Sequence, residues 1–89
     1  MTRPPLSNEP LKVRIGLRVK ELRALNKITQ EELSLRSGIY RTYITEIESG
    51  KRNPSASNIQ KLAAGLDMSV AAFFESDLFT SVEPRTTPW

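Results

Sequence analysis

The sequence of 89 residues contains neither cysteine nor histidine. Without cysteine there is no disulfide and no thiolate metal ligand, and without histidine a zinc site would depend on carboxylates alone. The same absences exclude nucleophilic catalysis by a Ser–His or Cys–His pair. Clustered carboxylates in an apolar setting are missing too, so we expect no enzyme, no metal, no cofactor and no small-molecule ligand.

Long apolar runs are also missing. No stretch is long enough to span a membrane, and the N-terminal segment Met1–Ser7 lacks the apolar part of a signal peptide. We therefore expect a cytoplasmic protein without a membrane partner. The length predicts one small domain, a size that usually needs a staple or an oligomer interface for stability. Alternating apolar and polar runs, the signal of strands, are absent.

The charge is distributed unevenly. Residues 1–66 carry twelve Lys or Arg and six Asp or Glu, a net charge of +6, whereas residues 67–89 carry one Arg and four Asp or Glu, a net charge of −3. A basic body with an acidic end suits a polyanionic partner on one face. Charge alone does not distinguish this arrangement from an ordinary solvated surface of mixed sign.

Two short helical patterns flank Gly38. The first begins after Thr29, which has the capping-box spacing to Glu32, and ends at Gly38, a residue that readily adopts the left-handed conformation. The second places Ile44 and Ile47 on one inward face at i, i+3 spacing. A helix, a tight glycine turn and a helix with polar outward residues are the pattern of a DNA-binding helix-turn-helix.

Two further runs extend this pattern, Arg41-Thr42-Tyr43-Ile44 and Gly50-Lys51-Arg52-Asn53-Pro54-Ser55. With them, the stretch from about Gly16 to Phe74 resembles the Cro/repressor-type (XRE-like) family, and most closely its small restriction-modification controller proteins. The resemblance implies an all-α fold, a compact bundle of about five helices with a central helix-turn-helix like that of the lambda repressor. The sequence departs from the family at Ser34, where alanine is common, and in its two terminal extensions.

The chain divides into an arm over residues 1–10, a helix-turn-helix domain with a C-terminal dimerisation helix over residues 11–79, and a tail over residues 80–89. We expect a first helix over Leu11–Asn26, with its arginines and lysines mostly outside. The apolar face of this helix consists of Ile15, Val19 and Leu22, closed by Leu25 or Ile28.

Two further helices are predicted beyond the central motif. Ser57 and Gln60 have capping-box spacing, which predicts a helix through about Leu66. Ser69 then caps a short final helix, Val70–Glu75.

The second motif helix, roughly Tyr40–Ser49, is the expected recognition helix, and its N-terminal residues would read base edges. The planar fork of Arg41 matches the two acceptors of guanine, and Thr42 offers a hydroxyl or a methyl group. Glu46, one turn further on, would either accept a hydrogen bond from cytosine or repel phosphate. The predicted base contacts are Arg41, Thr42 and Glu46.

The resemblance also implies contacts to the DNA backbone. The expected set is Gln30, Tyr40, Tyr43, Lys51, Arg52 and Asn53. For the two tyrosines, packing on the edge of the core is as plausible as a phosphate contact, and Arg52 has the minor groove as an alternative. Gln30 also fits ordinary helix-start chemistry. The family pattern pairs Arg23 with Glu48 in a structural ion pair that fixes the first helix against the recognition helix.

Apolar residues are in surplus near the end of the domain, which predicts a dimer surface. Its expected residues are Val70, Phe73, Phe74 and Leu78. Within this set we expect Phe73 to turn inward and Phe74 and the residues around Leu78 to form the interface; capping of the monomer core is the alternative. A two-fold dimer would place two recognition helices about 34–36 Å apart, one turn of DNA.

These patterns predict a homodimeric, sequence-specific regulator of transcription on a two-fold symmetric operator of double-stranded DNA. The resemblance favours an autoregulatory controller of a restriction-modification operon, with RNA polymerase as a candidate partner. The alternative is an antitoxin that binds DNA and, through the acidic segment Asp67–Trp89, a toxin protein.

Overall fold

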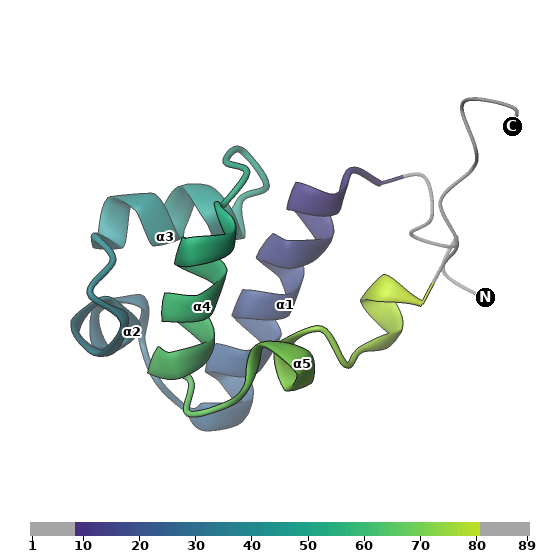
Figure 1. Ribbon diagram of the computed structural model, residues 1–89. Helices are drawn as coiled ribbons and strands as arrows, with labels where there is room; N and C mark the ends of the chain where they lie inside the picture. Colours follow the sequence, from purple (N-terminus) through teal and green to yellow (C-terminus); the bar gives the residue numbers. More distant parts are fainter. Residues whose placement is uncertain (1–8, 81–89) are drawn as a thin grey trace, which may run out of the picture.

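The computed structural model describes residues 9–80, and every regular element in that range is helical (Figure 1). The elements are α1 (Leu11–Asn26), α2 (Gln30–Ser37), α3 (Arg41–Glu48), α4 (Ala56–Gly65), α5 (Val70–Phe73) and the 3-10 turn η2 (Asp77–Phe79). The predicted all-α fold of about five helices is therefore confirmed. The expected arm and tail lie, apart from residues 9, 10 and 80, outside the described residues. None of the helices in residues 9–80 is long and apolar enough to cross a lipid bilayer.

The ends of α1 and α2 lie where local signals predict them. The hydroxyl of Thr29 accepts a hydrogen bond from the backbone N–H of Glu32 (3.0 Å), which satisfies one free donor at the start of α2. Gly38 follows α2 with φ 76°, and its N–H donates to the carbonyl of Ser34 (2.9 Å). The carboxylate of Glu32 pairs with Arg36 on the next turn (2.7 Å).

The start of α4 corrects one prediction. Ser55, and not Ser57, caps this helix: its hydroxyl accepts from the N–H of Asn58 (3.1 Å), so the helix begins two residues early. Pro54 disfavours a helical conformation at the residue before it, so the helix does not extend back into the loop.

The C-terminal elements also differ from the prediction. Ser69 caps α5 as expected, but α5 ends at Phe73, and a separate turn, η2, follows. The hydroxyl of Ser76 accepts from the N–H of Leu78 (3.2 Å), which starts this turn.

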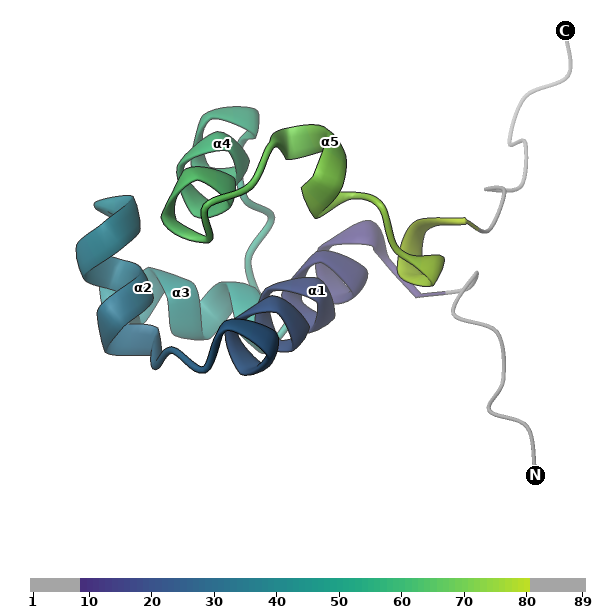
Figure 2. The same cartoon turned by 90° about the horizontal axis from the view of Figure 1, so that it is seen from below.

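One apolar core joins all the helices. α1 packs on α3, α2 packs on α3 and α4, α4 packs on α5, and η2 returns to α1. Figure 2 shows α4 and α5 lying over α1 and α3. The predicted inward residues of α1 are buried, and Ile28, rather than the exposed Leu25, closes that face. Full burial of each large apolar side chain contributes about 1.5–3 kcal/mol. The core consists of Ile15, Val19, Leu22, Ile28, Leu33, Ile39, Ile44, Ile47, Leu62, Ala63, Leu66 and Phe73.

Two arginines of α1 that were expected outside, Arg14 and Arg18, are buried. The Nε of Arg18 donates to the carbonyl of Phe73 (2.6 Å), and its Nη2 donates to the carbonyls of Ala72 (2.9 Å) and Glu75 (3.2 Å). A four-residue helix cannot satisfy its own last carbonyls. Arg18 supplies the missing donors and fixes α5 against α1.

Candidate nucleic-acid interface

The face of α3 that points away from the core carries the three predicted base-contacting residues. Ile44 and Ile47 are fully buried against α1, which fixes the orientation of α3 about its own axis. Arg41, Thr42 and Glu46 consequently face solvent and line one shallow hollow together with Thr45. Their arrangement follows directly from the helical spacing of the two isoleucines.

The two tyrosines at the start of α3 have different environments. Tyr40 precedes the helix and is 86% exposed. Tyr43 is half-buried, and its ring packs against the core. The guanidinium of Arg52 lies over this ring, 4.7 Å from its centroid. Of the two roles considered for these residues, packing on the edge of the core therefore belongs to Tyr43.

The loop after α3 runs back along this helix. Gly50 has φ 77°, a conformation that turns the chain sharply, and Lys51, Arg52 and Asn53 follow it as exposed residues. The Nε and Nη2 atoms of Arg52 both donate to Oε1 of Glu46, at 2.8 Å and 2.5 Å. This hydrogen bond, with the charge of Glu46, raises the pKa of Arg52 above its ordinary value. The loop is thus attached to the outward face of α3.

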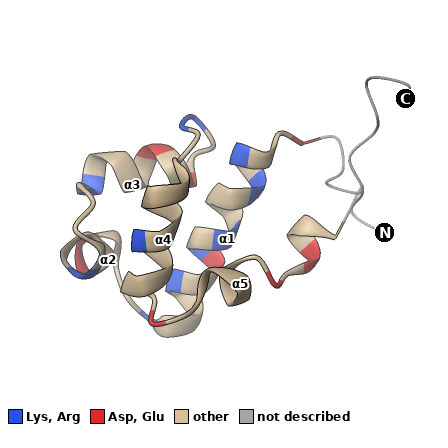
Figure 3. Ribbon diagram, in the orientation of Figure 1, with Lys and Arg blue, Asp and Glu red and all other residues tan. Residues whose placement is uncertain are grey.

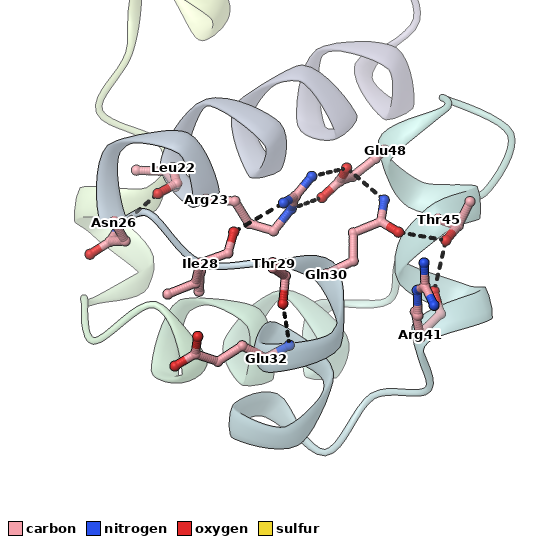
Figure 4. A network of polar contacts seen from close by, with 10 residues as sticks. All are labelled: Leu22, Arg23, Asn26, Ile28, Thr29, Gln30, Glu32, Arg41, Thr45 and Glu48. Carbon is pink, nitrogen blue, oxygen red and sulfur yellow. Dashed lines mark hydrogen bonds and ion pairs between the residues drawn. The ribbon is translucent and has the colours of Figure 1, made fainter.

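An ion pair joins α1 to the end of α3 (Figure 4). The Nε of Arg23 donates to Oε2 of Glu48 (2.5 Å) and its Nη2 donates to Oε1 (2.8 Å), while Nη1 donates to the carbonyl of Ile28 (3.1 Å). The side chains are 19% and 4% exposed respectively. The hydrogen bond to Glu48 raises the pKa of Arg23, against the effect of burial. A raised pKa means that the folded chain holds the proton of Arg23 more tightly than the unfolded chain does, so Arg23 stays charged at neutral pH.

Gln30 extends the ion pair to the middle of α3. Its Nε2 donates to Oε1 of Glu48 (2.9 Å), and its Oε1 accepts from the hydroxyl of Thr45 (3.0 Å). That hydroxyl proton is shared with the carbonyl of Arg41 (3.0 Å). Figure 4 shows these side chains as one continuous chain of contacts from α1 to the first turn of α3. Thr45, for which the sequence analysis predicted no role, is the last side chain in this chain of contacts.

Of the residues named for the dimer surface, Phe73 turns inward, as expected. Phe73 is 0% exposed in the single chain, so its side chain belongs to the core and is not available to a partner. Val70 is 42% exposed, and Phe74 and Leu78 are half-buried. Phe74 contacts both neighbouring rings edge-on, with centroid distances of 5.1 Å to Phe73 and 5.0 Å to Phe79.

Sequence reasoning missed one basic residue close to the start of α3. Lys61, on α4, shares a small hollow with Asn58 and the two tyrosines. A lysine on the polar side of an amphipathic helix carries no signal that separates it from an ordinary solvated charge.

Figure 3 shows acidic residues along the segment of α5 and η2, and basic residues at the start of α3, in the loop after it and on α4.

Comparison with known protein families gives a match over most of the described chain. The helix-turn-helix family matches residues 19–73, from the middle of α1 to the end of α5. The control protein C.MunI of a Mycoplasma species is 36% identical over 74 residues, which are 82% of this chain and 93% of that protein.

Two solved structures have the same fold. The restriction-modification controller C.AhdI of Aeromonas hydrophila superposes with a TM-score of 0.68 and 41% identity, over 71% of this chain and 96% of that chain. The controller C.Esp1396I, solved as a tetramer in complex with its natural 35 base-pair operator, superposes with a TM-score of 0.70 and 34% identity, over 73% of this chain and 86% of that chain.

Proposed function

This chain belongs to the helix-turn-helix family (HTH_3, XRE-type), and from that membership we propose that it is a sequence-specific DNA-binding regulator of transcription, without catalytic activity. The observation that carries the proposal is the outward face of α3. Arg41, Thr42 and Glu46 share one exposed surface, while Ile44 and Ile47 hold the helix against α1. A helix presented in this way fits the major groove.

The side chains divide into those that read sequence and those that position the protein. Arg41, Thr42 and Glu46 face the base edges. The residues around these three contact phosphates. Such contacts fix the register of α3 on the DNA but carry no sequence information. These residues are Gln30, Tyr40, Lys51, Arg52 and Asn53, with the hydroxyl of Tyr43.

We further propose that the chain acts as a homodimer on a two-fold symmetric operator, in the cytoplasm. Val70, Phe74 and Leu78 supply the contact. The structure of C.Esp1396I, a tetramer on its operator, supports assembly on DNA. Operator occupancy would then depend on the chain's own concentration, as autoregulation of a restriction-modification operon requires, with RNA polymerase as the partner at the promoter. No observation favours the antitoxin alternative.

Selection from a random pool of DNA duplexes at near-physiological salt tests the proposal. We expect an enriched inverted repeat whose half-sites lie about one helical turn apart. Binding without an enriched motif that disappears at moderate salt would mean attraction to the backbone alone and would contradict the proposal.

Arg41→Ala is expected to reduce affinity for the selected operator by about 1–3 kcal/mol and to relax discrimination at one base pair. Its control is Lys51→Ala, which should weaken binding to all sequences equally and lower the dependence of affinity on salt. Fluorescence anisotropy titrations on matched duplexes measure both. If Arg41→Ala binds the operator as wild type does, α3 is not the reading element.

Val70→Asp is expected to shift the chain from dimer to monomer, because a charge on an exposed apolar position makes burial against a second copy unfavourable. Leu35→Asp provides the control, since Leu35 is an exposed leucine on α2 that is no part of the proposed interface. Sedimentation velocity without DNA measures the association. An unchanged dimer in Val70→Asp would place the interface elsewhere.

A further inference from the structure

The contact between Arg52 and Glu46 uses only one side of the carboxylate. Both donors of Arg52 reach Oε1. Among residues 9–80, Oε2 of Glu46 has no hydrogen-bond partner. One acceptor atom on the outward face of α3 is therefore occupied, and its neighbour is open to a ligand.

Arg52 is held from a second direction by Tyr43. The guanidinium lies over the tyrosine ring at 4.7 Å, and that ring packs against the core. An exposed ion pair alone restricts its side chains weakly. Here the contact with the ring restricts the guanidinium further, so its two donors orient the carboxylate more closely than an exposed ion pair alone would.

The open oxygen belongs to the surface that faces bases. Glu46 shares its hollow with Arg41, Thr42 and Thr45, three exposed residues of α3. A carboxylate only accepts hydrogen bonds. In the major groove, the exposed donors are the N4 amino group of cytosine and the N6 amino group of adenine. Beside the latter lies the N7 acceptor of adenine, which repels a carboxylate.

We propose that Arg52 is a positioning residue for base reading: it neutralises Glu46 and orients the carboxylate so that Oε2 accepts a hydrogen bond from the N4 amino group of a cytosine. This inference rests on the proposed function and makes it more specific. It changes the role of Arg52 from a phosphate contact to a part of the reading surface. It also explains how an acidic residue is tolerated on a helix that approaches a polyanion.

The two roles of Arg52 predict different losses of binding. A phosphate contact contributes to all sequences equally and adds to the salt dependence. A positioning residue contributes only where Glu46 reads, and its contribution disappears when Glu46 is absent. A double-mutant cycle on matched duplexes separates these cases.

The experiment uses the full chain and the operator from the selection, in which each base pair of a half-site is replaced in turn. In Glu46→Ala and in Arg52→Ala, the preference for cytosine should fall about tenfold at the same position. In the double variant, this preference should fall no further than in Glu46→Ala. Arg52→Lys should keep most affinity for random sequence and still lose the cytosine preference, because an ammonium lacks the planar fork. Lys51→Ala, the neighbouring basic residue, should keep that preference.

Three outcomes overturn the inference. The first is that Glu46→Ala leaves every base preference unchanged. The second is that Arg52→Ala weakens all duplexes equally and leaves the cytosine preference intact. The third is that Arg52→Lys, whose fold is checked by circular dichroism, reads cytosine as wild type does. Failure of the wild-type chain to enrich any motif would instead contradict the proposed function.

Discussion

Replacement of Gly16 by alanine is expected to lower the free energy of unfolding by about 3 kcal/mol. Gly16 lies in the middle of α1, where it faces the end of α3. A Cβ at this position would overlap the carbonyl oxygen of Ile47 and lie 3.0 Å from that of Glu48. Both atoms belong to the backbone, so no side-chain rotation relieves the clash, and α1 must move away from α3.

The sign of this effect makes the prediction specific. In the interior of an ordinary helix, alanine is more favourable than glycine by about 1 kcal/mol. Ala24, an exposed residue of the same helix, is the control position: Ala24→Gly should destabilise the chain by about that amount. At Gly16 the opposite replacement, glycine by alanine, should also destabilise the chain.

Urea unfolding followed by far-UV circular dichroism measures both variants. The protein concentration must be the same throughout, because association in a dimer adds to the apparent stability. If Gly16→Ala is as stable as wild type or more stable, the close approach of α1 and α3 is absent in solution. The separation of these helices also sets where α3 lies, so we expect Gly16→Ala to bind operator DNA poorly even where it remains folded.

The helices were predictable because their signals are local. Thr29, Gly38 and Ser69 act on residues within four positions along the chain, and the structure confirms all three caps. The outward placement of Arg41 and Thr42 was predictable for the same reason, since the buried face of α3 fixes its exposed face.

Two features that sequence reasoning missed depend on distant parts of the chain. Arg18 is buried because the carbonyls of α5, more than fifty residues later, end beside it. Gly16 is required by the backbone of α3, and a helical pattern alone gives no reason for a glycine there. The attachment of Arg52 to Glu46 depends on how the loop after Gly50 returns along α3. The pairing of Arg23 with Glu48 came from family resemblance and not from any spacing.

Replacement of Arg23 by methionine is expected to lower the free energy of unfolding by about 3 kcal/mol. Methionine is similar in length but carries no charge. Among residues 9–80, the carboxylate of Glu48, 4% exposed, then keeps only Gln30 as a side-chain donor. An incompletely paired buried charge is costly because neither water nor a counter-charge solvates it. The carbonyl of Ile28 also loses its contact with Nη1.

The control is the exposed pair of Arg36 and Glu32 on α2, whose side chains are 45% and 46% exposed. Arg36→Met should change the free energy of unfolding by less than about 0.5 kcal/mol, because water solvates the remaining carboxylate. Urea unfolding of the two methionine variants, at one protein concentration, compares a buried pair with an exposed one in the same fold. Equal losses would mean that burial does not govern the cost.

The double variant Arg23→Met, Glu48→Leu identifies where the loss comes from. If the stranded carboxylate is the cause, removal of Glu48 should restore most of the stability, because apolar residues of similar volume replace such pairs at little cost. DNA affinity should not recover with it, since Glu48 also accepts from Gln30, which holds Thr45 on α3. Strictly additive losses in the double variant would contradict this account and would mean that Arg23 and Glu48 stabilise the fold independently. If the double variant is stable and binds DNA as wild type does, the pair stabilises the fold but does not position the reading face of α3.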